Sequence, residues 1–274
     1  YADRYQTLYR KSRSLNGPWE TPEVDTFDTR AFYAAKTGTD GVHRYVYGWN
    51  PTRENNEHHF DPLGYDGKDC NTWDWGGNLI VHELWQDENG DLFVKPVTSV
   101  LEAVSEEKII SMKPLTGSWQ IHENCAQVNT PYGYSALLLN PVKETSRLSF
   151  DVEAKGLAGS VGIAIHVDES FAVGYYINID FARRRMEFKT GVRMTEMGGQ
   201  MFPYEVELER PLSSKTGECF HVDVIVSGTI LEVYVDDRIA LGTRMFDITG
   251  GNFGLYASDA EANFTNIKIL EEKR

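Results

Sequence analysis

Aromatic side chains are concentrated between residues 30 and 50, in the stretch RAFYAAKTGTDGVHRYVYGWN. The pattern predicts two strands joined by a glycine-containing turn. Its rings, Tyr33 and Trp49 among them, could form the inner wall of a substrate pocket. They could equally be no more than the packing of a buried sheet, and the stretch alone does not decide between the two roles.

A second group of residues, His58, His59 and Asp61, has side chains that can bind a metal. Adjacent histidines point in different directions, however, and no third ligand stands at a recognised spacing. We therefore expect a solvated loop at this position and no metal site.

The three cysteines, Cys70, Cys125 and Cys219, are odd in number and far apart, and they form no CxxC pair. This spacing makes a zinc site or a disulfide framework improbable. We expect three free thiols, mostly buried as small apolar side chains.

The composition is that of an ordinary globular protein. The sequence is 41% hydrophobic and 25% charged. Its length of 274 residues is enough for one large domain or two medium ones. A net charge of -14 argues against nucleic acid as a partner, because a phosphate backbone selects basic patches. It does not argue against a neutral ligand such as a sugar. No run reaches the roughly 18 apolar residues that cross a bilayer, so no membrane partner is expected.

In almost every apolar segment of the chain, apolar and polar residues alternate with a period of two, or β-branched and aromatic residues form a short run between turn residues. Only residues 100–111 could hold a helical turn or two. The pattern therefore predicts an all-β protein. Because the chain begins at Tyr1, without a methionine and directly in strand-like sequence, we expect a piece of a longer polypeptide.

Two regions are predicted. Residues 1–97 contain four consecutive strands, AFYAAKT, HRYVYGW, NLIVHELWQ and LFVKPV, which is the content of one β-propeller blade. Residues 98–115 form a linker, and residues 116–274 have the strand spacing of a β-sandwich. One blade cannot bury both its faces alone. The first region therefore implies missing sequence, a second chain, or docking onto the sandwich.

Several segments resemble a known family. TLYRKSRSLNGPWE, RAFYAAKT, RYVYGWN, WDWGGNLIVHEL and GDLFVKPV are similar to the last blades of glycoside hydrolase family 32, the β-fructosidases. FHVDVIVSGTILEVYVDDRIALGTRMFD and GNFGLYAS are similar to the C-terminal β-sandwich of that family. The resemblance implies a partial, five-bladed-type propeller (its last blade or blades) followed by a C-terminal β-sandwich.

The resemblance also implies where the chemistry lies. The family carries an Asn-Asp-Pro nucleophile, an Arg-Asp-Pro stabiliser and a Glu-Cys acid/base on its first three blades. In this chain, Asp61-Pro62 has no preceding Arg, Glu218-Cys219 falls in a sandwich strand, and no Asn-Asp-Pro occurs. We therefore expect no catalytic residue in this chain, and the resemblance implies no metal or organic cofactor.

Four residues are implied as substrate-binding. Tyr33 matches the inner strand of a late blade, and Trp49 matches a tryptophan that closes the same side of the pocket. Arg30, where the family often has a small or acidic residue, could bind a hydroxyl or a neighbouring carboxylate. Asn50 could continue the pocket rim. A fructoside is the implied substrate.

Three functions stay open. The first is the C-terminal part of a hydrolase of fructosyl bonds in sucrose or fructans, acting with retention in the full-length parent and inactive alone. The second is a carbohydrate-binding sandwich, for which Tyr132, Tyr134, Tyr175 and Tyr176 are candidates, although alternation places half of them in the core. The third is a subunit of a split propeller that missing N-terminal blades or a partner chain complete. A homo-oligomer is a further alternative.

Overall fold

The computed structural model describes most of the chain. Its described residues are 6–29, 32–53, 73–155, 159–190, 193–194, 200–201, 206–212, 217–245 and 248–273. Within them, strands make up nearly all of the regular structure, as the sequence predicts. No helix among these residues is long and apolar enough to span a membrane.

The first sheet is an antiparallel meander of four strands in the order β1-β2-β3-β4. These strands are β1 (Tyr33–Thr39), β2 (Arg44–Arg53), β3 (Trp73–Gln86) and β4 (Leu92–Lys95). The β1–β2 turn is held by Asp40, whose carboxylate accepts hydrogen bonds from the backbone amides of Val42 and His43. Gly41 takes the positive φ of 95° in this turn, a conformation that glycine adopts at little cost.

The chain then passes through the helix α1 (Thr98–Ala103) into a second sheet of thirteen strands among the described residues. Its strands are β5 (Val104–Lys108), β6 (Lys113–Thr116), β7 (Trp119–His122), β8 (Cys125–Pro141), β9 (Thr145–Lys155), β10 (Ser160–Val167), β11 (Tyr175–Asp180), β12 (Arg185–Thr190), β15 (Val206–Pro211), β16 (Cys219–Ser227), β17 (Ile230–Val235), β18 (Ile239–Arg244) and β19 (Asn252–Glu272). A separate ribbon pairs β13 (Arg193–Met194) with β14 (Gln200–Met201).

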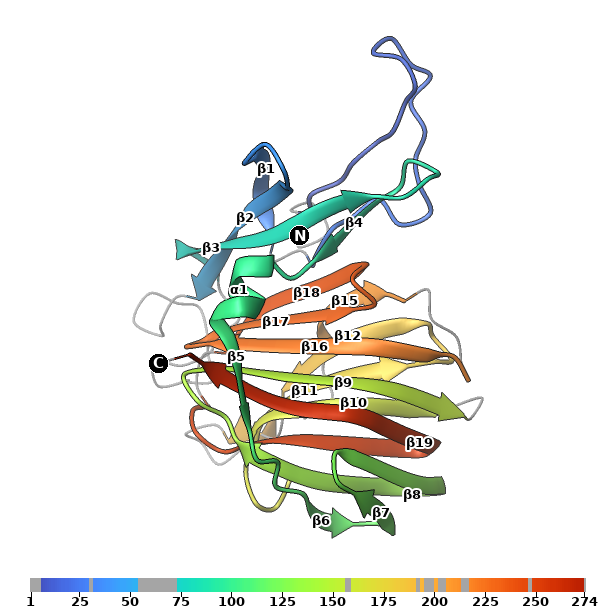
Figure 1. Ribbon diagram of the computed structural model, residues 1–274, viewed down its shortest axis with the longest axis vertical. Helices are drawn as coiled ribbons and strands as arrows, with labels where there is room; N and C mark the ends of the chain where they lie inside the picture. Colours follow the sequence, from blue (N-terminus) through green and yellow to red (C-terminus); the bar gives the residue numbers. More distant parts are fainter. Residues whose placement is uncertain are drawn as a thin grey trace.

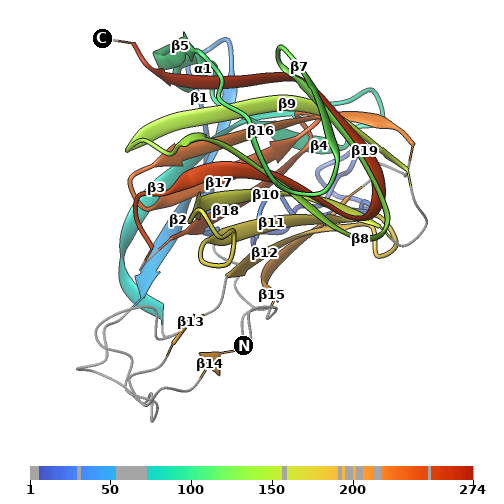
Figure 2. The same ribbon diagram turned by 90° about the horizontal axis from the view of Figure 1, so that it is seen from below.

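The long strand β19 folds this second sheet into two layers (Figures 1 and 2). Its first half pairs with β10 and β8, and its second half pairs with β9 and β5. The main path runs β15-β12-β11-β10-β19-β9-β16-β17-β18. Alternate side chains of both layers, such as Ile163, Phe253 and Val224, meet in one apolar core. This burial of one face of each layer is the arrangement of a β-sandwich.

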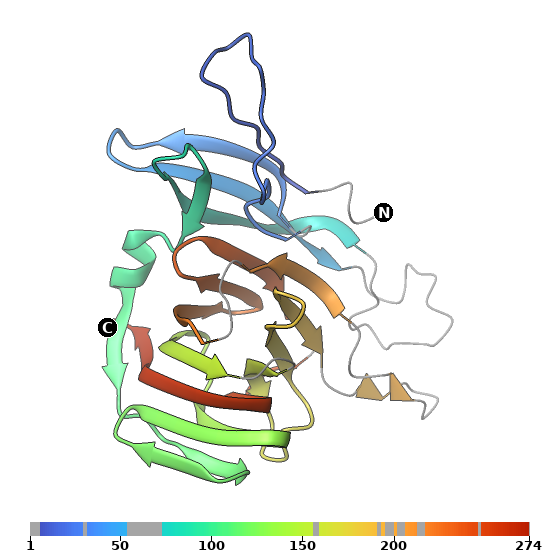
Figure 3. The same cartoon turned by 90° about the vertical axis from the view of Figure 1, so that its right-hand side faces the viewer.

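The four-stranded sheet packs on the sandwich at β17 and β18 (Figures 1 and 3). The two sheets share a second apolar core, in which Phe32, Ile80 and Val94 meet Tyr234 and Ala240. Docking onto the sandwich therefore covers one face of the four-stranded sheet. That this sheet is a propeller blade stays a prediction.

Two local predictions can be compared with the structure. The helical turn predicted within residues 100–111 is present as α1, slightly earlier in the chain. Cys125 and Cys219 are free thiols, as predicted. The prediction that the cysteines are mostly buried is wrong, since Cys125 is half-buried and Cys219 is exposed. Cys219 begins β16, where its side chain lies outside the core. Cys70 lies outside the described residues.

Candidate functional site

Tyr33 and Trp49 lie opposite each other on neighbouring strands. The antiparallel register of β1 and β2 pairs the two residues, and their ring centroids are 5.9 Å apart in an edge-to-face arrangement. Both are half-buried. Leu79 of β3 pairs with Trp49 and is 64% exposed. The structure therefore brings together two of the four predicted binding residues beside an exposed apolar neighbour.

The alternation of β2 sends its side chains to two faces. Val46, Gly48 and Asn50 are buried, while the intervening Tyr45, Tyr47 and Trp49 are half-buried. We call the surface formed by Tyr33, Tyr45, Tyr47, Trp49 and Leu79 the aromatic face of the first sheet. It is the face turned away from the sandwich.

Asn50 lies on the opposite face of β2 from Trp49. Its side-chain amide donates to the carbonyl of Thr243, with 3.2 Å between Nδ2 and O. Arg244 donates to the carbonyl of Asn50 at 3.3 Å and to the side-chain oxygen of Asn78 at 2.6 Å. The structure thus places Asn50 at the contact with β18, apart from the Tyr33–Trp49 pair. Arg30, the fourth predicted residue, lies outside the described residues, as do His58, His59 and Asp61.

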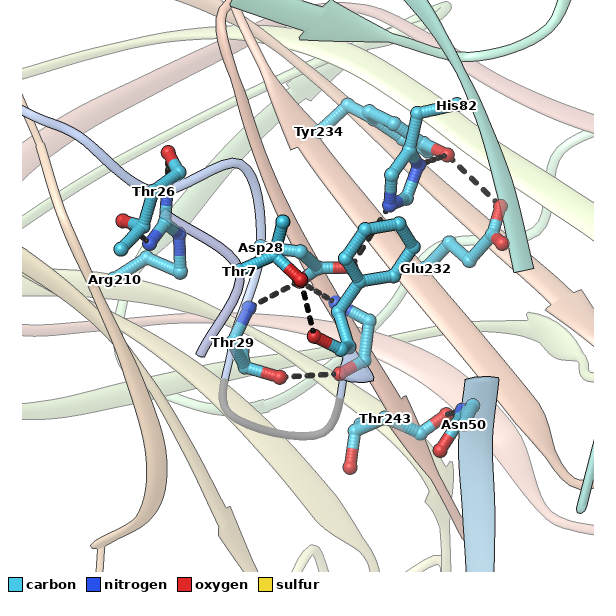
Figure 4. Close-up of polar contacts among 12 residues, drawn as sticks. Thr7, Thr26, Asp28, Thr29, Asn50, His82, Arg210, Glu232, Tyr234 and Thr243 are labelled. Atoms are coloured by element: carbon cyan, nitrogen blue, oxygen red, sulfur yellow. Dashed lines mark hydrogen bonds and ion pairs between the residues drawn. The ribbon is translucent and has the colours of Figure 1, made fainter. Parts of the chain in front are cut away.

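A buried chain of polar groups joins the two sheets beside Asn50 (Figure 4). His82 of β3 lies 2.9 Å from the Asp28 carboxylate through Nε2 and 2.7 Å from the Tyr234 hydroxyl through Nδ1. Tyr234 in turn donates to Glu232, at 2.9 Å. The side chains of Asp28 and His82 are fully buried. These polar contacts connect the N-terminal segment, β3 and β17.

Asp28 is held by more than His82. Its Oδ1 accepts hydrogen bonds from the amides of Thr29 at 2.6 Å and Gly242 at 2.5 Å. Burial alone would raise the pKa of this carboxyl, but the hydrogen bond from His82, its charge and the Gly242 amide together lower the pKa below its ordinary value. Asp28 therefore stays ionised inside the contact between the sheets.

The net pKa shifts of the two groups on β17 are opposite to that of Asp28. Burial raises the pKa of Glu232. Burial and the neighbouring Glu232 raise the pKa of Tyr234 well above the ordinary value. Tyr234 is therefore a neutral phenol at physiological pH.

Asp28, His82 and the Tyr234 hydroxyl have the order of a hydrolytic triad but not its setting. The hydroxyl is a phenol that already donates to Glu232, and Asp28, His82 and Tyr234 are all buried. A nucleophile needs room for a reacting atom about 3 Å away. The chain of polar groups is therefore suited to fixing the two sheets together and not to catalysis.

Arg210 fixes the N-terminal segment to the sandwich from β15. Its guanidinium donates to the hydroxyl of Thr26 and, at 2.9 Å, to the Thr26 carbonyl. Burial lowers the pKa of Arg210 to about 10, so the group remains charged at neutral pH.

A cleft of about 510 Å³ lies beside this segment, between the β3–β4 turn and the β11–β12 hairpin. Arg183, Arg184 and Arg238 line it together with Glu23 and Asp87. Because charges of both signs border the cleft, it favours neither anions nor cations.

Sequence reasoning missed the polar chain because its members are distant in sequence, His82 lying 54 residues from Asp28 and 152 from Tyr234. One local signal was present. Gly242 stands inside the strand IALGTR, and a glycine within a strand often marks a close approach of another group. A Cβ at this position would lie 2.5 Å from Oδ2 of Asp28.

The chain was compared with known proteins. Residues 119–271 match the family model described as the C-terminal part of the glycosyl hydrolases family 32. Curated protein sequences gave no match.

Solved structures gave matches over nearly the whole chain. An exo-inulinase from Aspergillus awamori has 15% sequence identity and a TM-score of 0.61, over 98% of this chain and 50% of the enzyme. A beta-fructofuranosidase from Aspergillus kawachii, complexed with glycerol, has 13% identity and a TM-score of 0.60, over 98% and 50%. A beta-fructofuranosidase variant from Bombyx mori, in complex with sucrose, has 13% identity and a TM-score of 0.53, over 98% and 47%. The chain thus spans about half the length of these enzymes, and the likeness is one of fold.

Proposed function

This chain belongs to glycosyl hydrolase family 32, and we propose that it is the C-terminal part of an enzyme that hydrolyses fructosyl bonds in sucrose or fructans. The family match over residues 119–271 carries this proposal. The fructosidases and the inulinase named above support it, since they align with 98% of this chain. We propose residues 1–97 as the last propeller blade or blades, 98–115 as a linker and 116–274 as the sandwich.

We infer that the catalytic carboxyl groups lie outside this chain, because its sequence has no Asn-Asp-Pro motif. Retaining hydrolysis uses two carboxyl groups about 5–5.5 Å apart, one as nucleophile and one as acid/base. We infer that upstream sequence, or a partner chain, supplies both groups on the preceding blades. The isolated chain would then be inactive.

Within that enzyme, Tyr33 and Trp49 would form an aromatic wall beside the sugar. Ring faces suit the C–H surface of a sugar, and the Tyr33 hydroxyl can orient a sugar hydroxyl. Asn50 lies on the other face of β2, so a contribution from it would act through the position of β2. A role for Arg30 in binding a hydroxyl remains part of the proposal.

The decisive experiment compares this chain alone with the same chain joined to its upstream polypeptide, on sucrose, inulin and levan. We expect turnover only when the upstream part is present, whether covalently joined or added as a separate chain. Turnover by the isolated chain would overturn the proposal. A joined protein that folds but cleaves none of the three substrates would also overturn the proposal.

The aromatic wall is tested in the joined protein. Tyr33→Ala and Trp49→Ala should each raise KM about tenfold or more, because each removes a stacking surface from the bound sugar. Trp19→Ala is the matched control, since Trp19 is exposed on the N-terminal segment. Unchanged KM and kcat in both test variants would show that the two rings only pack the sheet.

A further inference from the structure

The N-terminal segment forms a narrow two-stranded ribbon that projects past the first sheet (Figures 1 and 3). Residues 7–11 run antiparallel to residues 20–26. Lys11 and Glu20 exchange two backbone hydrogen bonds, at 3.1 and 2.8 Å, and the Tyr9 amide donates to a carbonyl of the opposite strand at 2.9 Å. The inner edge of residues 7–11 is therefore paired.

The outer edge of residues 7–11, which we call the ribbon edge, is open. Backbone amides of successive residues in an extended strand point to opposite sides. Because the amides of Tyr9 and Lys11 point to the opposite strand, those of Leu8 and Arg10 point outward. Neither of these two amides donates to a backbone carbonyl of the described residues. The Leu8 side chain is 53% exposed at this edge.

The charged side chains next to the ribbon edge are bound elsewhere. The Arg10 guanidinium donates to the Asp25 carboxylate, across the ribbon, at 2.6 Å. The Lys11 ammonium group donates to the Asp91 carboxylate of the β3–β4 turn at 2.7 Å. Exposed strand edges are commonly protected by charged side chains, by proline or by a covering element. The ribbon edge instead presents Leu8, so it is suited to pairing with another strand.

Contacts with the first sheet hold the ribbon in place. Tyr9 belongs to the core that the two sheets share, and its ring stacks on Phe27 with 5.1 Å between the centroids. The Tyr9 hydroxyl accepts a hydrogen bond from the Leu92 amide at 3.0 Å. The Thr7 hydroxyl donates to the Phe32 carbonyl at 3.2 Å. The ribbon edge is therefore pre-organised, which lowers the entropy lost when a partner binds.

We propose that an extended strand of the upstream polypeptide pairs with the ribbon edge, accepting hydrogen bonds from the amides of Leu8 and Arg10. The upstream polypeptide is part of the proposed function, and the pairing therefore rests on that function. Because the chain spans about half the length of the enzymes that align with it, the upstream part is long enough to supply the strand. A two-stranded ribbon is only marginally stable in water, and a third strand would complete it.

Strand addition also defines the chemistry of the partner. Backbone hydrogen bonds supply the affinity in this mode of binding, and alternate side chains supply the specificity. Side chains directly opposite each other on neighbouring strands are in contact. The added strand should therefore carry an apolar side chain opposite Leu8.

The test is hydrogen exchange at single-residue resolution, in this chain alone and in the same chain joined to its upstream polypeptide. Exchange at the amides of Leu8 and Arg10 should slow by about fivefold or more on joining, because each gains a hydrogen bond. The amides of Tyr9 and Lys11, which are already bonded, are internal controls and should change less. Equally fast exchange at Leu8 and Arg10 in both proteins would overturn the proposal.

A pair of variants at one position gives a second test. Leu8→Pro removes the outward amide, whereas Leu8→Ala keeps it. Proline is tolerated in an edge strand where the amide faces solvent, so the two variants of the isolated chain should unfold at the same temperature. In the joined protein, Leu8→Pro should restore fast exchange at Arg10 and Leu8→Ala should not. Slow exchange at Arg10 in both joined variants would contradict the pairing.

Turnover of sucrose, inulin and levan by the same joined protein separates this pairing from the proposed function. Slow exchange at Leu8 and Arg10 without turnover would support the pairing and count against the reaction. Turnover with fast exchange at both amides would overturn the pairing and leave the reaction standing. Slow exchange in the isolated chain that is lost on dilution would show that a second copy occupies the ribbon edge, and would also overturn the proposal.

Discussion

At the scale of single residues, burial distinguishes two histidines that each pair with a carboxylate. His82 is fully buried between Asp28 and Tyr234, whereas His43 pairs with Glu83 at 3.0 Å with its side chain 41% exposed. Removing one partner of a buried ion pair leaves the other charge without compensation, which is far more costly than losing a surface pair.

We therefore expect His82→Ala to lower the free energy of unfolding by about 3–5 kcal/mol. His43→Ala should lower it by about 1 kcal/mol or less. Urea denaturation of the two variants beside the unaltered chain measures both effects. Similar losses in the two variants would contradict the view that Asp28 depends on His82.

A third histidine, His221, resembles a catalytic base but is held in the wrong protonation state. Nδ1 lies 2.6 Å from Asp151, and Nε2 lies 3.3 Å from both Asp223 and the Ser149 hydroxyl. The Asp223 hydrogen bond, against burial and with help from Asp151, raises the pKa of His221 to about 9. A protonated imidazole cannot accept the Ser149 proton, so this arrangement is structural.

The raised pKa makes stability depend on pH. Because folding favours the protonated ring, its stabilisation is complete below the ordinary pKa of 6.5 and is lost as the pH rises through about 9. We expect the urea midpoint to fall between pH 7 and pH 10, with a shallower fall in His221→Gln. Equal slopes for the two proteins would show that His221 does not contribute. Its half-exposed side chain makes the effect modest.

At the scale of elements, β19 unites the sandwich. It has strands on both sides along most of its 21 residues, whereas β1 is at one end of the four-stranded sheet and pairs with β2 alone. Amides of β19 such as that of Leu255 should therefore exchange with solvent only on global unfolding, and those of β1 by local opening. Native-state hydrogen exchange measures this difference, and comparable protection of both strands would contradict it.

The strands also show which features of the fold can be predicted from sequence patterns. Alternation predicted the strands and the division of the Tyr175–Tyr176 pair between core and surface, because both follow from neighbouring residues. The prediction that Asn50 continues the pocket rim accompanies the family resemblance and does not follow from alternation, and its side chain lies on the opposite face of β2 from Trp49. The Asp28–His82–Tyr234 contacts could not be predicted, since they depend on how two sheets dock.

At the scale of the whole molecule, the first sheet is joined to the sandwich by two kinds of contact. They share an apolar core and the polar chain from Asp28 to Glu232. A four-stranded sheet that loses one covered face exposes much of its apolar surface. The described residues of the first sheet therefore depend on the sandwich for their fold.

A fragment of residues 1–97 should consequently be unfolded or aggregated by circular dichroism. A fragment of residues 98–274 should keep its β signal and a cooperative thermal transition, because its principal core lies within the sandwich. A cooperative transition in the isolated first fragment would contradict the dependence of the first sheet on β17 and β18.

The side chains on the two faces of β2 are under different structural constraints. Val46, Gly48 and Asn50 must match β17 and β18, and a Cβ at Gly48 would already lie 2.8 Å from the Phe32 ring. Tyr45, Tyr47 and Trp49 face away from that contact. Relatives of this chain should therefore vary more freely at Tyr45, Tyr47 and Trp49, and should change Val46, Gly48 and Asn50 only together with residues of β17 and β18. An insertion of one residue would exchange the two sets and disable both.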